Sequence, residues 1–203
     1  MRVLDLGGHK TQKRGRFDLS LFGLRVTCLN LTSAKQPDVL GDAAALPFAA
    51  DVFDAVVCAE LLEHVYDPRR VIGEVARVLR PGGRVLITVP FLVQIHGDPD
   101  DFGRYTDSFW RRALLDAGFE GVMIESQGHF WSVQIDALRS WFLNLRQQSS
   151  GRRWWFPIVT WGLVWARARA IRTESGPEQS STSATRHFTT GFGIAARKQH
   201  RPR

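Results

Sequence analysis

The chain has 203 residues, of which 44% are hydrophobic and 23% are charged, and its formal net charge is +7. This length and composition predict one globular domain and exclude a disordered or fibrous chain. The two cysteines lie in apolar runs, so neither a disulfide framework nor a metal site is predicted. With no apolar run long enough to span a membrane and no signal peptide before the first predicted strand, we expect a cytoplasmic protein.

The first half of the sequence alternates short apolar runs with turns. A helix is predicted to begin at Asp67-Pro68, because Asp is a favoured N-cap and Pro a favoured first residue. Pro81-Gly82-Gly83 is predicted to end it. Strand, helix and strand over about forty residues form a βαβ unit with parallel strands. The predicted strands are residues 2–6, 25–30, 39–40, 53–58 and 84–89.

Polar residues follow these strands, and parallel sheets bind ligands at the carboxyl ends of their strands. Asp5 lies in an apolar strand, where an acid needs a partner, and Gly7-Gly8 would let a ligand approach the backbone. The alternative is that Asp5 caps the turn. Asn30 and Asp42 end the next two strands. The G-x-G-x-x-G fingerprint and the P-loop are absent, which disfavours NAD and nucleoside triphosphates.

A polar loop follows the strand that ends near Pro90. It concentrates His96, Asp98, Asp101 and Arg104. A His beside a carboxylate can act as a general base, so His96 is the first candidate, with Asp101 or Asp98 as the residue that orients it. His64 is the second candidate base. The alternative is a loop held together by Asp–Arg pairs.

The second half contains an unexpected segment. After a helix over 106–117 and a strand over 119–125, two helices are predicted over 132–147 and 153–171. They form an insert over 129–172, followed by a flexible linker over 173–187, a last strand over 188–197 and a basic tail over 198–203. Five Trp fall between residues 141 and 165. They favour a helix at a membrane surface, a lid over an apolar acceptor, or simple packing of the insert.

Three stretches of the sequence resemble one family. VLDLGG, GDAAALPFAADVFDAVVCAELLEHVYDPRRVIGEVARVLRPGGRVLITVPF and RYT…LLDAGF are similar to the class I S-adenosylmethionine-dependent methyltransferases, and most similar to the methyltransferase type 11 group. The resemblance covers about residues 1–126 and the last strand. It implies an α/β fold with a Rossmann-like, mostly parallel seven-stranded sheet of order 3-2-1-4-5-7-6. In that fold strand 7 is antiparallel and helices cover both faces; the Trp-rich helical insert precedes the last strand.

The resemblance also implies a cofactor, S-adenosyl-L-methionine, and the residues that bind it. Residues after the first strand would lie beside its methionine part, the end of the second strand at the ribose, the end of the third at adenine, and the end of the fourth near the sulfonium. His9 and Asn30 stand where the family usually has a glycine and an acid. The implied cofactor-binding residues are Asp5, Gly7, Gly8, Asn30, Asp42, Ala43, Leu46, Cys58, Ala59 and Glu60.

The expected function is therefore methyl transfer to an oxygen of a small-molecule, glycan or lipid-linked acceptor, with His96 and Asp101 as catalytic residues. HGDPDDFGRYT is similar to a run in a bacterial subset associated with cell-surface glycan or lipid metabolism. With the Trp-rich insert, this predicts peripheral contact with the inner face of the membrane. Nucleic-acid methylation is disfavoured, because strand four ends in Cys58-Ala59-Glu60-Leu61 rather than in an Asn-Pro-Pro-aromatic motif. A non-catalytic binding protein is the other alternative. The sequence leaves the oligomeric state open.

Overall fold

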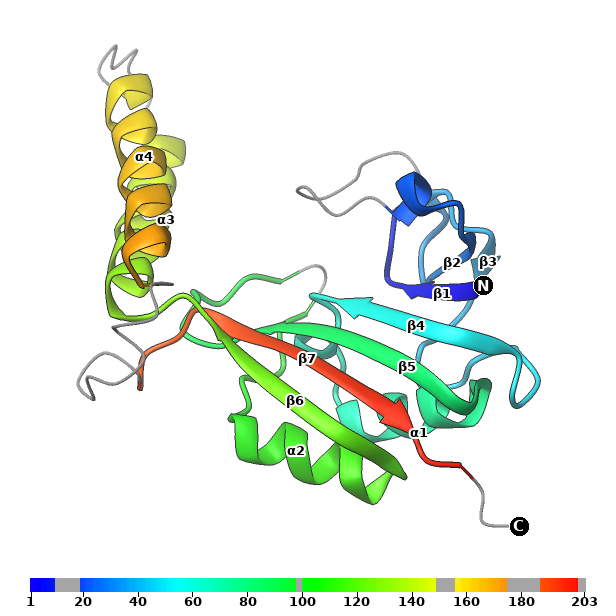
Figure 1. The fold of residues 1–203 in the computed structure, drawn as a ribbon. Coiled ribbons are helices and arrows are strands. Elements are labelled where there is room, and N and C mark those ends of the chain that lie inside the picture. The colour runs from blue at the N-terminus through cyan, green and yellow to red at the C-terminus, as the bar shows by residue number, and fades with distance from the viewer. Residues whose placement is uncertain (10–18, 98–99, 149–155, 175–186, 201–203) are drawn as a thin grey trace. The chain divides into compact units, whose positions relative to one another are not determined.

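A computed structural model of the protein describes residues 1–9, 19–97, 100–148, 156–174 and 187–200 (Figure 1). These residues contain a seven-stranded sheet of order β3-β2-β1-β4-β5-β7-β6 with β7 antiparallel, which confirms the predicted architecture. The chain divides into two compact units. The first unit comprises Met1–Val89, Gly97–Glu125 and Gly193–Arg203, and the second comprises Pro90–His96 and Ser126–Phe192.

The first four strands pair in parallel. Val3 and Leu4 of β1 and Val57 and Cys58 of β4 are at most 7% exposed, and because successive residues point to opposite faces, both faces of these strands are covered. The strand bounds are β1 (Arg2–Leu6), β2 (Arg25–Asn30), β3 (Val39–Leu40) and β4 (Phe53–Ala59). In the connection between β1 and β2, residues Leu19–Phe22 form the short helical turn η1.

The helix of the βαβ unit begins as its sequence predicts. In α1 (Pro68–Val78), Pro68 takes the first helical position. The Asp67 carboxylate accepts hydrogen bonds from the backbone amides of Arg69 and Arg70 at 3.1 and 3.3 Å. Its apolar face buries Val71, Ile72 and Val75. Figure 1 shows α1 on the same face of the sheet as α2 (Asp107–Asp116).

The next strand begins earlier than predicted. β5 (Leu79–Pro90) starts directly after α1, so Pro81-Gly82-Gly83 lies inside a strand and does not form the turn that ends the helix. The pairing with β4 shifts register between Phe53 and Ala55, and Gly82 adopts a φ of +78°. A bulge of this kind accommodates the proline and the glycine that a regular strand would exclude.

The last strands complete the core. Trp110 of α2, Phe119 of β6 (Phe119–Gln127) and Ile194 of β7 (Gly191–Lys198) are at most 1% exposed. Lys198, which the sequence analysis placed in a basic tail, instead ends β7. Its ammonium donates to the Leu79 carbonyl at 2.5 Å and to Asp51 at 2.7 Å, so the chain stays attached to the sheet through this residue.

The second unit contains a helical hairpin of α3 (Phe130–Gln148) and α4 (Phe156–Glu174), which we call the α3–α4 hairpin. Most of the predicted linker lies outside the described residues; Glu174 belongs to α4. The rings of Phe142 and Phe156 lie 4.8 Å apart, and Arg167 donates to Asp136 at 2.6 Å. None of the helices in the described residues is long and apolar enough to cross a membrane.

Glu174 joins the two ends of the hairpin. Its carboxylate is 9% exposed and accepts backbone N–H bonds from His129 at 3.0 Å, Trp131 at 2.7 Å and Ser132 at 3.3 Å, and a bond from the Ser132 hydroxyl. An acid at the end of one helix thus caps the start of another, where the backbone amides have no helical partner.

We therefore expect Glu174→Ala to destabilise the second unit by about 2–4 kcal/mol, because it removes the cap and leaves buried amides unsatisfied. Denaturant unfolding, combined with hydrogen exchange at the first turn of α3, measures this. The matched control is Glu120→Ala, which removes an exposed ion pair with Arg197 and should cost less than about 1 kcal/mol. Equal effects of the two substitutions would contradict the assigned role of Glu174.

Candidate functional site

The parallel register of the first unit brings the predicted cofactor residues to one edge of the sheet. Leu6 at the end of β1 pairs with both Leu29 of β2 and Cys58 of β4. Asn30 pairs with Leu40 at the end of β3. The residues that follow these positions therefore emerge at the same carboxyl edge, the edge at which open parallel sheets bind ligands. We call it the strand-end edge.

Gly7 and Gly8 have conformational and steric reasons to be glycine. Gly7 has a φ of +74°, and its amide donates to the Leu29 carbonyl at 2.9 Å. A Cβ on Gly8 would lie 2.0 Å from a carboxylate oxygen of Asp5. The Asp5 side chain thus lies directly against a backbone that has no room for a side chain of its own.

Asp5 is the most unusual acid of this edge. Burial raises the pKa of its carboxyl from the ordinary 3.8 to about 6. A cation placed beside Asp5 would favour the charged form of its carboxyl and offset the free-energy cost of desolvation. The alternative prediction, that Asp5 caps the following turn, is not supported by any hydrogen bond found for its carboxylate among the described residues.

Asn30 connects two loops of the edge. Its amide nitrogen donates to the Gly8 carbonyl at 3.2 Å, and its carbonyl oxygen accepts from the Thr32 amide at 3.2 Å. The side chain therefore fixes the Gly7-Gly8 turn relative to the end of β2. The ribose role that the resemblance implies for Asn30 stays a prediction.

The residues after β3 have different exposures. Asp42 is exposed, and one of its carboxylate oxygens accepts from the Ala44 amide at 2.8 Å. Ala43 and Leu46 are 8% and 5% exposed. Leu46 also donates its amide to Glu74 at 2.7 Å. The structure thus presents Asp42 to solvent at the edge, and Leu46 is mostly core.

β4 ends at the edge in a sharp turn. Ala59 is exposed, and Glu60 adopts a left-handed φ of +49° while its amide donates to the Thr88 carbonyl at 2.9 Å. Burial raises the pKa of the Cys58 thiol, and the carboxylates of Glu63, Asp5 and Glu60 raise it further, in that order. The thiol therefore stays protonated and is not a nucleophile.

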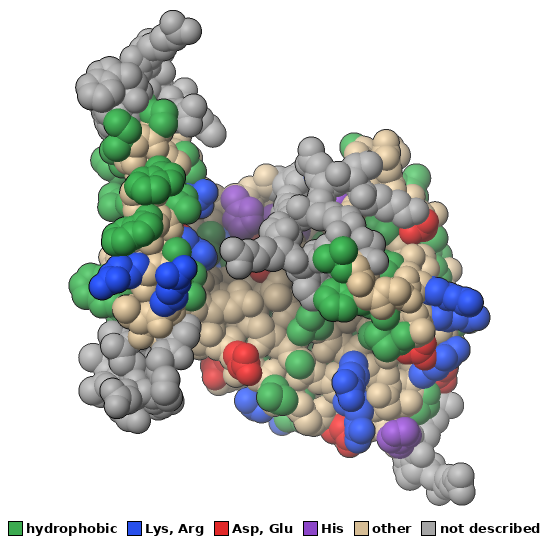
Figure 2. Space-filling view, turned by 45° about the horizontal axis from the view of Figure 1, so that its top comes forward, with side chains coloured by type: hydrophobic (Ala, Val, Ile, Leu, Met, Phe, Trp, Pro, Cys, Tyr) green, Lys and Arg blue, Asp and Glu red, His purple; other side chains and the backbone are tan. Residues whose placement is uncertain are grey.

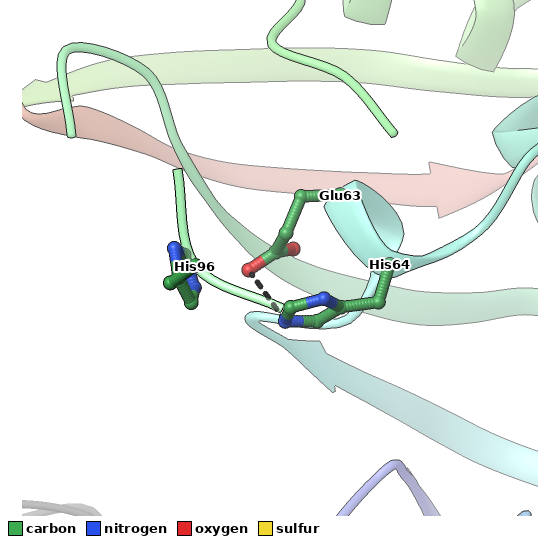
Figure 3. Close-up of side chains that lie close together, drawn as sticks. All are labelled: Glu63, His64 and His96. Carbon is green, nitrogen blue, oxygen red and sulfur yellow. Dashed lines mark ion pairs between the residues drawn. The ribbon is translucent and has the colours of Figure 1, made fainter. Parts of the chain in front are cut away.

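Glu63 is a residue that sequence reasoning missed. It lies with His64 on the turn η3 (Leu62–His64), is 1% exposed, and has its Oε1 3.7 Å from Nε2 of His64 (Figure 3). His64 Nδ1 lies 2.5 Å from the Asp100 carbonyl, which can only accept, so this nitrogen carries the proton. Carboxylate and imidazole are also side chains that ligate divalent cations. The LEH sequence shows both residues, but not that the acid is buried.

Asp101 forms a bidentate ion pair with Arg104, with the second contact at 2.7 Å, and is 3% exposed. This pair raises the pKa of Arg104, and Glu63 and Glu60 raise it further. The loop is therefore held by an Asp–Arg pair, the alternative expected for it. Arg104 is a second residue whose place at the edge the sequence does not reveal.

His96 belongs to the second unit, and its Nδ1 lies 3.2 Å from the Gln94 carbonyl. Its action with Asp101 of the first unit stays a prediction. Asp98, the other candidate partner, lies outside the described residues.

A comparison with known proteins matches part of the chain to one family. Residues 14–87 match the model of the family described as "Methyltransferase domain", type 11. Demethylmenaquinone methyltransferase of Mycolicibacterium paratuberculosis is 53% identical over 51 residues, which cover 25% of this chain and 22% of that relative. The chain thus matches less than a quarter of the length of this relative.

Solved structures share the fold. The phosphoethanolamine N-methyltransferase 2 of Haemonchus contortus, solved with phosphomonomethylethanolamine and S-adenosylhomocysteine, has a TM-score of 0.60 at 16% identity. The similarity covers 98% of this chain and 49% of that one. The [4+2]-cyclase SpnF has a TM-score of 0.58 at 21% identity and covers 98% of this chain and 75% of its own. Part of the chain thus matches the methyltransferase type 11 family model, and the chain as a whole shares the fold of these solved structures.

Proposed function

We propose that the protein transfers a methyl group from S-adenosyl-L-methionine to an oxygen of a small-molecule, glycan or lipid-linked acceptor. The observation that carries the proposal is the half-buried Asp5 carboxyl, with its raised pKa, against the Gly7-Gly8 turn. A half-buried acid beside backbone that lacks side chains suits a ligand with a cationic group and a chain that can lie along that backbone.

The residues at the strand-end edge fit this cofactor, whose sulfonium supplies an already activated methyl group. Asp5 would hold the cationic methionine part, and the Gly7-Gly8 turn would allow close approach. Asn30 would serve the ribose through the loop that it fixes, and the exposed Asp42 would accept a hydrogen bond from an amino group of adenine. Ala59 and Glu60, after β4, would flank the sulfonium end.

The chain's own task in the reaction is alignment and proton removal. In-line displacement requires that donor and acceptor be held in one geometry and that water be excluded. A hydroxyl acceptor must also lose a proton, and we assign that step to His96. Asp101 would contribute by holding the 101–104 loop through its pair with Arg104.

The acceptor class rests on two observations. The matched relative is named for demethylmenaquinone, a small-molecule acceptor, although the match spans less than a quarter of that protein. The α3–α4 hairpin exposes Trp131, Trp141, Trp161 and Trp165, which favours an apolar or lipid-linked acceptor.

The charge of Asp5 should control the affinity for the cofactor. Because its pKa is about 6 in the free protein, the ionised form that attracts the cofactor's cationic groups is lost below that pH. Affinity for S-adenosylmethionine should therefore fall about tenfold from pH 7.5 to pH 5. Calorimetry with S-adenosylmethionine and with S-adenosylhomocysteine measures it. In Asp5→Asn, affinity should be weak at both pH values.

The same substitution has an opposite effect on the free protein. Folding raises the pKa of the Asp5 carboxyl, so the folded state holds this proton more tightly than the unfolded state. The free energy of unfolding therefore falls as pH rises through about 6. The unfolding free energy of Asp5→Asn minus that of the parent protein should thus be larger at pH 8 than at pH 5. Denaturant unfolding at the two pH values checks this. A variant that lost both stability and binding at pH 8 would contradict a ligand-binding role for Asp5.

The role of His96 as general base can be tested by substitution. His96→Ala should lower kcat by about 10²–10⁴-fold while affinity for S-adenosylmethionine stays unchanged, because a general base acts on the acceptor and not on the cofactor. Turnover is measured as release of S-adenosylhomocysteine across a panel of hydroxylated small molecules, glycans and lipids. His200→Ala, which changes an exposed histidine at the end of the described chain, is the control.

Unchanged turnover in His96→Ala would remove it as the base. Tight binding of S-adenosylmethionine without turnover on any acceptor would instead favour the non-catalytic alternative.

A further inference from the structure

One face of α4 is exposed along the whole helix. Ile158, Trp161, Trp165, Arg169 and Arg172 are exposed, and their spacing of three, four, four and three residues places them in one stripe of an α-helix. Ile158, Trp161 and Trp165 are 62%, 71% and 60% exposed. We call this set the α4 stripe.

The opposite face of α4 accounts for the packing of the hairpin. Phe156, Ala170 and Glu174 are buried, and Arg167 pairs with Asp136 of α3. The contacts of α4 within the hairpin are therefore made by this face, and the α4 stripe is not needed to hold the hairpin together. Two exposed tryptophans on a stable helix are a large apolar surface for a protein to leave in water.

The chemistry of the α4 stripe changes along the helix. Its first part is apolar and its last part carries Arg169 and Arg172, with the Arg169 guanidinium 6.0 Å from the ring centre of Trp165. The one carboxylate of α4, Glu174, is buried and engaged at the start of α3. The exposed face of α4 is therefore cationic with no compensating acid.

The same surface is visible in the space-filling view. Figure 2 shows hydrophobic side chains gathered along the α3–α4 hairpin and Lys or Arg side chains toward one end of it. α3 adds exposed apolar side chains of its own, Trp131, Leu138 and Trp141, at a spacing of seven and three residues.

We infer that the α4 stripe binds the surface of an anionic lipid bilayer. Tryptophan rings suit the boundary between headgroups and acyl chains, and arginine can lay its apolar stem along that boundary while its guanidinium meets lipid phosphate. The charge of the stripe is complementary to an anionic leaflet. With three arginines and Glu174 on the helix, the geometry is that of surface contact and not of insertion across the bilayer.

A second copy of the chain is the main alternative to lipid as the partner of the α4 stripe. Two copies would place Arg169 and Arg172 of one stripe near those of the other or against tryptophan, with no acid on the face to pair them. A surface of phosphates satisfies those charges, and it is therefore the partner that the stripe fits better.

Co-sedimentation with vesicles tests the inference on the full chain. The probes are vesicles of phosphatidylcholine alone and of phosphatidylcholine with phosphatidylglycerol. The protein should sediment with the anionic vesicles, far less with the neutral ones, and less at high salt. Replacing both tryptophans, Trp161→Ser with Trp165→Ser, should weaken binding about tenfold or more. Arg169→Glu with Arg172→Glu should abolish the preference for anionic vesicles.

The matched control is Met123→Gln, which changes an exposed apolar residue of β6 and should bind vesicles as the parent protein does. Circular dichroism and thermal unfolding show whether each variant is folded. Failure of the parent to sediment with anionic vesicles, or equal binding by the double tryptophan variant, would overturn the inference. So would a parent protein that is dimeric by light scattering and becomes monomeric in that variant.

The inference does not depend on methyl transfer. Calorimetry with S-adenosylmethionine on the same variants should give the parent affinity, so a failure of cofactor binding and a failure of vesicle binding are separate results.

Discussion

The parallel pairing of β1 with β2 and β4 is the constraint on which the candidate site depends. It sets Leu6 beside Leu29 and Cys58, so the residues that follow these strands emerge at one edge. This arrangement also sets an acid, Asp5, within a strand of the sheet, and desolvation raises the pKa of its carboxyl. A bound cation would offset the free energy that desolvation of the Asp5 carboxylate costs in the free protein, and we therefore place the cofactor there.

Local sequence signals predict the βαβ unit, whereas the strand order of the whole sheet was implied by the family resemblance. Asp67-Pro68 and the apolar spacing that follows define α1, and β-branched runs on either side define its neighbouring strands. The start of β5 was missed for a specific reason. Pro81-Gly82-Gly83 normally ends a helix, and only the bulge opposite Phe53 to Ala55 makes it part of a strand.

The candidate site was predictable only in part. Strand tips and glycines are visible in a sequence, so Asp5 and the Gly7-Gly8 turn could be named. Burial is a property of the assembled fold, and the buried Glu63 beside His64 could not. Nor could the contacts of Asn30, whose two polar groups connect Gly8 and Thr32. The bidentate pair of Asp101 with Arg104 was one of two alternatives, and only geometry decides between them.

The fold by itself does not determine the reaction, since a [4+2]-cyclase shares it. The central claim is therefore that the strand-end edge of the first unit binds S-adenosylmethionine, and hydrogen exchange with and without S-adenosylhomocysteine tests it most directly. The account predicts slower exchange at residues 7–8, 30–32, 42–45 and 59–61. Unchanged exchange at all four segments, or protection confined to the second unit, would contradict it.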